Sequence, residues 1–219
     1  MKSLILIVTF ITLASCSNIN CKKDNSLIKP LTDTIVKHDT AFLGNGDNWQ
    51  KGFGLTNNPD KDSIWGKPIR YYINNPKCSP IAKDFYSGQF RPTDNETTSA
   101  LLSLATTRYN ELRPFYRWCL NKTILIQDGA LAEYTGVPAR HYAEQFPKEF
   151  FEYMDFDTTG QKYSDWVSSI SYSGYYDNED YKRPEKIREN LIKLMSENCK
   201  HCDNKTLKRI EQFAKDCFE

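Results

Sequence analysis

Two closely spaced cysteines near the C-terminus are of a type and spacing that could form a redox pair, part of a metal site or a structural disulfide. Cys199 and Cys202 are three positions apart, with His201 between them. A redox-active CxxC pair normally lies at a helix N-terminus in a βαβ framework, and zinc normally takes four ligands, often from two such pairs. The pattern around these cysteines is helical, and the chain has no second CxxC. We therefore favour a structural disulfide, with thiol oxidoreductase chemistry as an alternative.

The first residues predict export. Lys2 precedes an apolar run at 4–14, which is too short to span a bilayer but is typical of a signal peptide. Leu13-Ala14-Ser15-Cys16 resembles the lipobox of bacterial lipoproteins, whose cysteine becomes the lipidated first residue of the mature chain. The resemblance covers residues 1–16 and implies a signal peptide at 1–15, lipidation of Cys16 and a membrane anchor in the bacterial cell envelope, either facing the periplasm or on the outer-membrane surface. The alternative is an ordinary secretory signal.

Export also predicts how the other six cysteines behave, because disulfides persist in an oxidising compartment. Cys199 and Cys202 are close enough in sequence to pair with each other. Cys217 lies fourteen residues after Asp203, about 21 Å along a helix, whereas bonded cysteines have Cα atoms within about 7 Å. We therefore expect Cys217 to pair elsewhere, with Cys119 or Cys78 as its partner.

Helical signals dominate the chain after residue 78 and must position these cysteines. Ser79-Pro80 predicts a helix that stops at Gly88, Thr93 and Glu96 have the spacing of a capping box, and Asp203 is a good N-cap for the last helix. Further helical patterns follow four prolines, at positions 114, 138, 147 and 184. The last two helices are expected at 184–199 and 203–218, with a connection short enough for an antiparallel hairpin.

These signals predict an all-α fold. We expect a single disulfide-stapled domain at 49–219 with seven or eight short helices, ending in the antiparallel helical hairpin. Its N-terminal part is predicted to be rich in loops, with at most one short strand or hairpin, for which the β-branched and aromatic residues at 69–73 are the best candidate. Residues 16–48 are polar and patternless, and we interpret them as a flexible tether.

Charge argues against a nucleic-acid partner. Lys and Arg number 29, Asp and Glu number 28, and removal of the leader with Lys2 leaves a mature chain of zero net charge. Nucleic-acid binding normally needs a basic stripe, and no block of like charge is present. Asn58, Asp60 and Asp62 alternate like calcium ligands, but the glycine and glutamate of an EF-hand loop are missing. We expect no metal and no cofactor.

The segment 108–155 is densest in functional-looking side chains. Its arginines and aromatic residues could line a cleft that clamps a carboxylate, because the guanidinium group binds carboxylates with two parallel bonds. The stronger interpretation is that these arginines join neighbouring helices through ion pairs. The candidate binding residues of the segment are Arg117, Glu133, Arg140 and His141. His141 could act as a general base, but no nucleophile motif accompanies it.

A tyrosine-rich stretch at 172–181 has the composition of a protein-recognition loop, although tyrosines that lie on their own core are the stronger interpretation. Its candidate binding residues are Tyr172, Tyr175, Tyr176 and Tyr181. Together these features predict a non-catalytic domain of the cell envelope with a protein partner, in an inhibitory, immunity or accessory role. The alternative is an envelope hydrolase or carbohydrate-active enzyme with its site at 108–155, which would need two of its glutamates about 5–10 Å apart across a groove.

Overall fold

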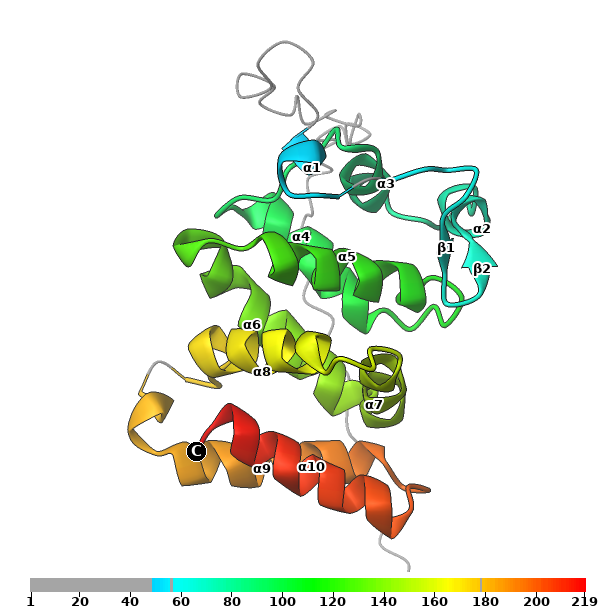
Figure 1. Ribbon diagram of the computed structural model, residues 1–219. Helices are drawn as coiled ribbons and strands as arrows, with labels where there is room; N and C mark the ends of the chain where they lie inside the picture. Colours follow the sequence, from blue (N-terminus) through cyan, green and yellow to red (C-terminus); the bar gives the residue numbers. More distant parts are fainter. Residues whose placement is uncertain (1–48, 56, 178) are drawn as a thin grey trace, which may run out of the picture. The chain divides into compact units, whose positions relative to one another are not determined.

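The structure is a computed structural model that describes residues 49–55, 57–177 and 179–219, all of which belong to one compact unit (Figure 1). Three predicted features, the signal peptide, the lipidation of Cys16 and the flexible tether, lie outside the described residues, as does Cys21.

The all-α prediction is confirmed. The described residues contain ten α helices, of which eight have eight or more residues, together with two short 3-10 segments and one two-stranded antiparallel sheet. The elements are α1 (Trp49–Gly52), β1 (Ser63–Ile64), β2 (Lys67–Pro68), α2 (Ile69–Ile73), α3 (Pro80–Ser87), α4 (Glu96–Ser103), η2 (Leu104–Thr106), α5 (Arg113–Ile126), α6 (Gly129–Gln145), α7 (Pro147–Asp155), α8 (Gln161–Ser173), η3 (Asp180–Lys182), α9 (Pro184–Asn198) and α10 (Asn204–Cys217).

Most helix boundaries follow the local signals. Helix α3 begins at Pro80 and ends before Gly88, whose φ of 81° is the left-handed conformation that glycine adopts readily. The predicted capping box at Thr93 and Glu96 is wrong by two residues. Asn95 is the N-cap of α4, because its side chain accepts a hydrogen bond from the Thr98 backbone N–H, while Thr93 accepts one from the Asn95 amide.

The predicted strand at 69–73 is wrong, because this segment forms helix α2. Ile69 and Tyr72, three residues apart, are both buried on one helical face, and the Tyr72 hydroxyl donates to the Ile64 carbonyl at 2.8 Å. Burial of that face outweighs the β propensity of the segment. The strands lie just before it, with Ser63 opposite Pro68 and Ile64 opposite Lys67.

Helices α6 and α8 pack against each other at very short range. A Cβ atom on Gly136 of α6 would lie 2.4 Å from the Ser173 hydroxyl and 2.5 Å from the Ser169 carbonyl, so only glycine fits there. The Gly136 N–H donates to the Ser173 hydroxyl at 3.1 Å. Helical residues follow Pro138 as predicted, but this proline lies inside α6 and not at a helix start.

Two clusters of buried side chains form the core. The N-terminal core cluster is built around Trp49, Tyr72, Phe85 and Phe115 and includes Cys78 and Cys119. The C-terminal core cluster is built around Phe150, Trp166 and Phe213 and includes Cys199 and Cys217. Helix α5 contributes to both clusters, through Phe115 and Cys119 to the first and through Leu120 and Ile124 to the second.

Helices α9 and α10 form the predicted antiparallel hairpin, which is the orange and red pair in Figure 1. Cys199 and Cys202 form a disulfide at the turn, with Cα atoms 5.3 Å apart. At the other end, Arg188 of α9 donates to the Phe218 carbonyl at 3.3 Å. The Asp203 side chain caps α10 by accepting from the Thr206 N–H, as predicted.

Among the described residues, none of the helices combines the length and the apolar character needed to cross a bilayer.

Candidate functional site

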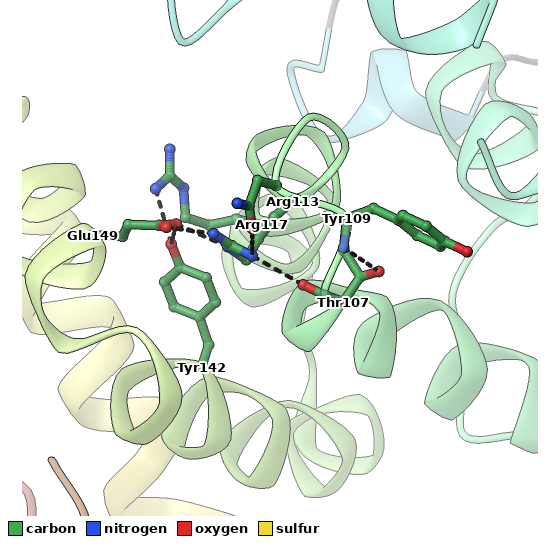
Figure 2. Close-up of polar contacts among 7 residues, drawn as sticks. Thr107, Tyr109, Arg113, Arg117, Tyr142 and Glu149 are labelled. Atoms are coloured by element: carbon green, nitrogen blue, oxygen red, sulfur yellow. Dashed lines mark hydrogen bonds and ion pairs between the residues drawn. The ribbon is translucent and has the colours of Figure 1, made fainter. Parts of the chain in front are cut away.

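Helix α5 places two buried arginines one turn apart, and the first is fully paired. The Arg113 Nε donates to Glu149 Oε2 at 2.9 Å and its Nη2 donates to Oε1 at 2.5 Å, which is the bidentate geometry of a strong arginine–carboxylate pair. Its Nη1 donates to the Thr107 carbonyl and to the Asn110 side chain. Arg113 therefore joins α5 to α7 and to the loop before α5 (Figure 2).

Arg117, the second arginine, is buried at 1 % exposure and has no carboxylate partner among the described residues. Its Nη1 donates to the Tyr142 hydroxyl at 2.9 Å. The guanidinium carbon lies 4.0 Å from the Tyr153 ring centroid and 4.4 Å from that of Trp65, both within the range of cation–π attraction. Nε and Nη2 have no hydrogen-bond partner within the described chain, so a buried cation lies in an aromatic cage with one edge unpaired.

Tyr142 connects the two arginines. Its hydroxyl accepts from Arg117 and donates to Glu149 Oε2 at 3.5 Å (Figure 2). Burial raises the pKa of Tyr142 to about 12, although the Arg117 charge acts in the opposite direction. Tyr142 is therefore a neutral hydroxyl at physiological pH and supplies no negative charge to Arg117.

Two lysines add positive charge near this cage. Lys162 Nζ lies 4.2 Å from the Tyr153 ring centroid and donates to the Tyr153 carbonyl. Burial lowers the pKa of Lys162, and the charges of Arg117 and Lys122 lower it further, while Asp157 opposes them. Burial also lowers the pKa of Lys122. Asp157 opposes this effect at Lys162, and Asp62 opposes it at Lys122.

The second predicted arginine, Arg140, lies in a different cluster that supports the interpretation of a structural ion pair. Its Nη1 donates to Glu144 Oε1 at 2.7 Å, and both side chains are buried. The Tyr176 hydroxyl donates to the same Glu144 oxygen, and the Arg140 guanidinium lies 3.7 Å from the Tyr176 ring centroid. Asn198 of α9 donates to the Glu144 carbonyl, so this cluster fastens α6 to α9 and to the loop after α8.

Glu133, Glu144 and Glu149, the glutamates of segment 108–155 that a glycoside-cleaving site could use, lie in different environments. Glu133 is exposed and lies eleven residues before Glu144 on α6, which is about 16 Å along the helix axis. Glu144 and Glu149 are held by different arginines. His141 is exposed and lies beside Arg140, with the ring Nε2 3.4 Å from Arg140 Nη2. Its ring is nevertheless partly shielded from solvent, and this desolvation and the Arg140 charge lower the pKa of His141, while Glu144 opposes them.

The predicted recognition tyrosines divide into two pairs. Tyr175 and Tyr176 are half-buried against their own domain, through the Phe218 ring and Glu144 respectively. Tyr172 and Tyr181 are 56 % and 59 % exposed. Only the second pair is free to contact another molecule over most of its surface.

An exposed aromatic pair was missed by the sequence analysis. Trp65 and Phe156 are 38 % and 73 % exposed, and their ring centroids are 4.6 Å apart. Trp65 occupies the turn between β1 and β2 together with Gly66, and both have positive φ, 52° and 72°. This conformation suits a two-residue hairpin turn but is strained for a bulky residue. The glycine at position 66 is a sequence signal for this turn. No local sequence pattern predicts the contact between Trp65 and Phe156.

The predicted pairing of Cys217 with Cys119 or Cys78 is wrong. Cys78, Cys119 and Cys217 are free and buried, and Cys217 lies in the C-terminal core cluster whereas the other two lie in the N-terminal one. Burial raises the pKa of the Cys119 and Cys217 thiols well above the usual value. Next to the bonded pair is an open hollow of about 490 Å³, lined by Lys148, Glu197, Asn198, Cys199, Lys200, His201 and Cys202.

The possible calcium loop is a turn. Asp62 Oδ2 accepts from the Asn58 N–H at 2.7 Å and from the Tyr86 hydroxyl at 2.8 Å. Asp60 pairs with Arg70 at 2.5 Å. Within the described ranges, no group of three or more His, Cys, Asp or Glu residues is arranged to hold a metal ion.

Comparisons of this chain with protein-family models, with curated proteins and with solved structures find no match.

Proposed function

We propose that the chain is an exported bacterial lipoprotein, held in the cell envelope through Cys16, whose helical domain binds a protein partner and does not itself catalyse a reaction. The anchor rests on the likeness of residues 13–16 to a lipobox. A lipid-anchored domain meets its partners at a membrane surface, where an inhibitory, immunity or accessory role is suitable.

The observation that carries the proposal is the Trp65–Phe156 pair. Aromatic side chains dominate the energetics of protein interfaces, and here two rings in tilted contact lie at the surface, with Phe156 73 % and Trp65 38 % exposed. Trp65 also keeps a strained positive φ, and such strain occurs more often at binding and switch regions than elsewhere. The partner surface that fits this face is therefore apolar at its centre.

Capture by site-specific cross-linking from intact envelopes tests the binding proposal. We expect one partner to be captured by the wild-type protein and lost from the Trp65→Ala/Phe156→Ala variant. The matched control is Tyr172→Ala/Tyr181→Ala, which removes two comparably exposed aromatic rings from the other candidate surface and is expected to retain the partner. If Tyr172→Ala/Tyr181→Ala loses the partner and Trp65→Ala/Phe156→Ala retains it, the interface lies at the tyrosines and not at the Trp65–Phe156 pair.

The anchor has a separate test. Metabolic labelling with a fatty acid should label the wild-type protein and not the Cys16→Ser variant, and the variant should leave the membrane fraction. Equal labelling of both proteins would contradict lipidation at Cys16 and leave the binding proposal intact.

A further inference from the structure

Arg113 and Arg117 lie on the same helix, one turn apart, and provide an internal comparison. In Arg113, Nε and Nη2 form the edge that holds both oxygens of Glu149. In Arg117, the same two atoms have no partner among the described residues. This edge is the one with which a guanidinium binds a carboxylate side-on.

Burial makes the unpaired edge significant. A buried donor without a partner costs free energy, and more so when it is charged. The aromatic rings of Trp65 and Tyr153 offset part of this cost through their negative faces, but a ring face does not replace a hydrogen bond to Nε or Nη2. The Tyr142 hydroxyl is already used by Nη1.

We propose that the Nε–Nη2 edge of Arg117 is a binding site for a carboxylate group that comes from outside the described chain, and that the Trp65 side chain is its movable cover. The carboxylate accepts one hydrogen bond from each of the two nitrogens, as Glu149 does on Arg113. Two properties favour an anion at this position: Lys162, which lies against the Tyr153 ring, adds positive charge, and Glu149, which accepts from the Tyr142 hydroxyl, is engaged by Arg113.

Trp65 is suited to the role of a cover. It lies in the two-residue turn of a hairpin whose strands have only two residues each. Its ring contacts Arg117, Tyr153 and Phe156 and is 38 % exposed. Rotation of this single side chain would expose the guanidinium while the helices stay in place.

The inference goes beyond the proposed function, because it requires neither the lipid anchor nor a particular partner. The carboxylate has two possible sources, a small organic acid or an acidic side chain of another protein. Acetate and propionate represent the first source, and a short peptide with one glutamate between apolar residues represents the second.

The test follows the Arg117 Nε–H resonance by NMR while each probe is added at constant ionic strength. We expect a saturable shift with acetate or with the peptide and none with chloride. Arg117→Met lacks this resonance and is followed instead through the Trp65 indole N–H signal; it should weaken binding about tenfold or more, since the charge-assisted bonds are lost. Arg70→Lys, a change to an exposed arginine on α2, is the matched control and should bind as the wild type does.

Trp65→Ala removes the proposed cover, and it tests the site even if the Trp65 ring keeps the probes out of the wild-type protein. This variant should bind acetate at least as well as the wild type. Saturation by the acids alone assigns the site to small carboxylates, and saturation by the peptide alone assigns it to an acidic side chain. The proposal is overturned if neither the wild type nor Trp65→Ala shows a saturable shift, or if inorganic phosphate binds more tightly than every carboxylate.

Discussion

Arg113 and Arg117 are equivalent residues of one helix face with opposite electrostatic situations: the first shares its guanidinium edge with Glu149, and the second keeps the same edge unpaired under Trp65. This contrast distinguishes a structural ion pair from a candidate binding site within a single turn of α5. It also sets opposite expectations for what substitution of each arginine does to stability.

Arg117→Met should leave stability unchanged or increase it. Replacing a buried, imperfectly compensated charge by an apolar side chain of similar volume is often neutral or stabilising by about 1–4 kcal/mol. Urea unfolding followed by circular dichroism measures the effect. A loss of more than about 2 kcal/mol would show that the cation–π contacts already satisfy Arg117, and would argue against an external carboxylate.

Glu149→Gln should destabilise the protein, because it leaves the buried Arg113 without its counter-charge. The loss should be smaller than the about 3–5 kcal/mol typical of a fully buried pair, since the Glu149 side chain is 36 % exposed. Glu152→Gln on the same helix is the control, because Glu152 is exposed, and it should change stability by less than about 0.5 kcal/mol.

Gly136→Ala should destabilise the protein by about 1–3 kcal/mol, because the added Cβ overlaps backbone atoms of α8. Gly129→Ala is the matched control at the start of the same helix, where a Cβ has no atom within 4 Å. It should be neutral or stabilise by up to about 1 kcal/mol, because alanine restricts the unfolded chain. Thermal unfolding of both variants gives the comparison, and equal behaviour would contradict the close approach of α6 and α8.

Loss of the Cys199–Cys202 disulfide should cost about 2 kcal/mol, which is what the chain-entropy model gives for so short a loop. The Cys199→Ser/Cys202→Ser variant, compared with the wild type under non-reducing conditions, measures this difference in urea. Adding a reductant should bring the wild type to the stability of the variant and leave the variant unchanged. A variant as stable as the oxidised wild type would exclude a stapling role and favour the thiol oxidoreductase alternative.

Asp157 should make stability depend on acidic pH. Its carboxylate accepts from the Lys162 N–H at 2.7 Å and from Thr159, and these bonds lower its pKa from 3.8 to about 2. Because the pKa is lower in the folded state, the stabilisation is fully present above about pH 4 and is lost as the pH falls toward 2. The Asp157→Asn variant should lack this part of the pH dependence, as measured by urea midpoints between these pH values.

Local signals in the sequence were sufficient for several helix boundaries after residue 78 and for the C-terminal hairpin. Ser79-Pro80, Gly88 and Asp203 act through bonds and dihedral angles within a few residues, so their effects can be predicted without knowledge of the fold. The pairing of Cys199 with Cys202 is also local, because three residues around a helix end bring the two Cα atoms within bonding range.

The tertiary structure decided what depends on distant segments. Burial of Ile69 and Tyr72 turned a strand-like stretch into α2, and the packing of α10 placed Cys217 in a different core cluster from Cys119. The packing of the helices also places Glu149 against Arg113 and leaves Arg117 Nε and Nη2 without a partner among the described residues. It places Trp65 next to Phe156. Spacing along the chain determines which face of a helix a side chain occupies, but only the packing of helices determines what that face meets.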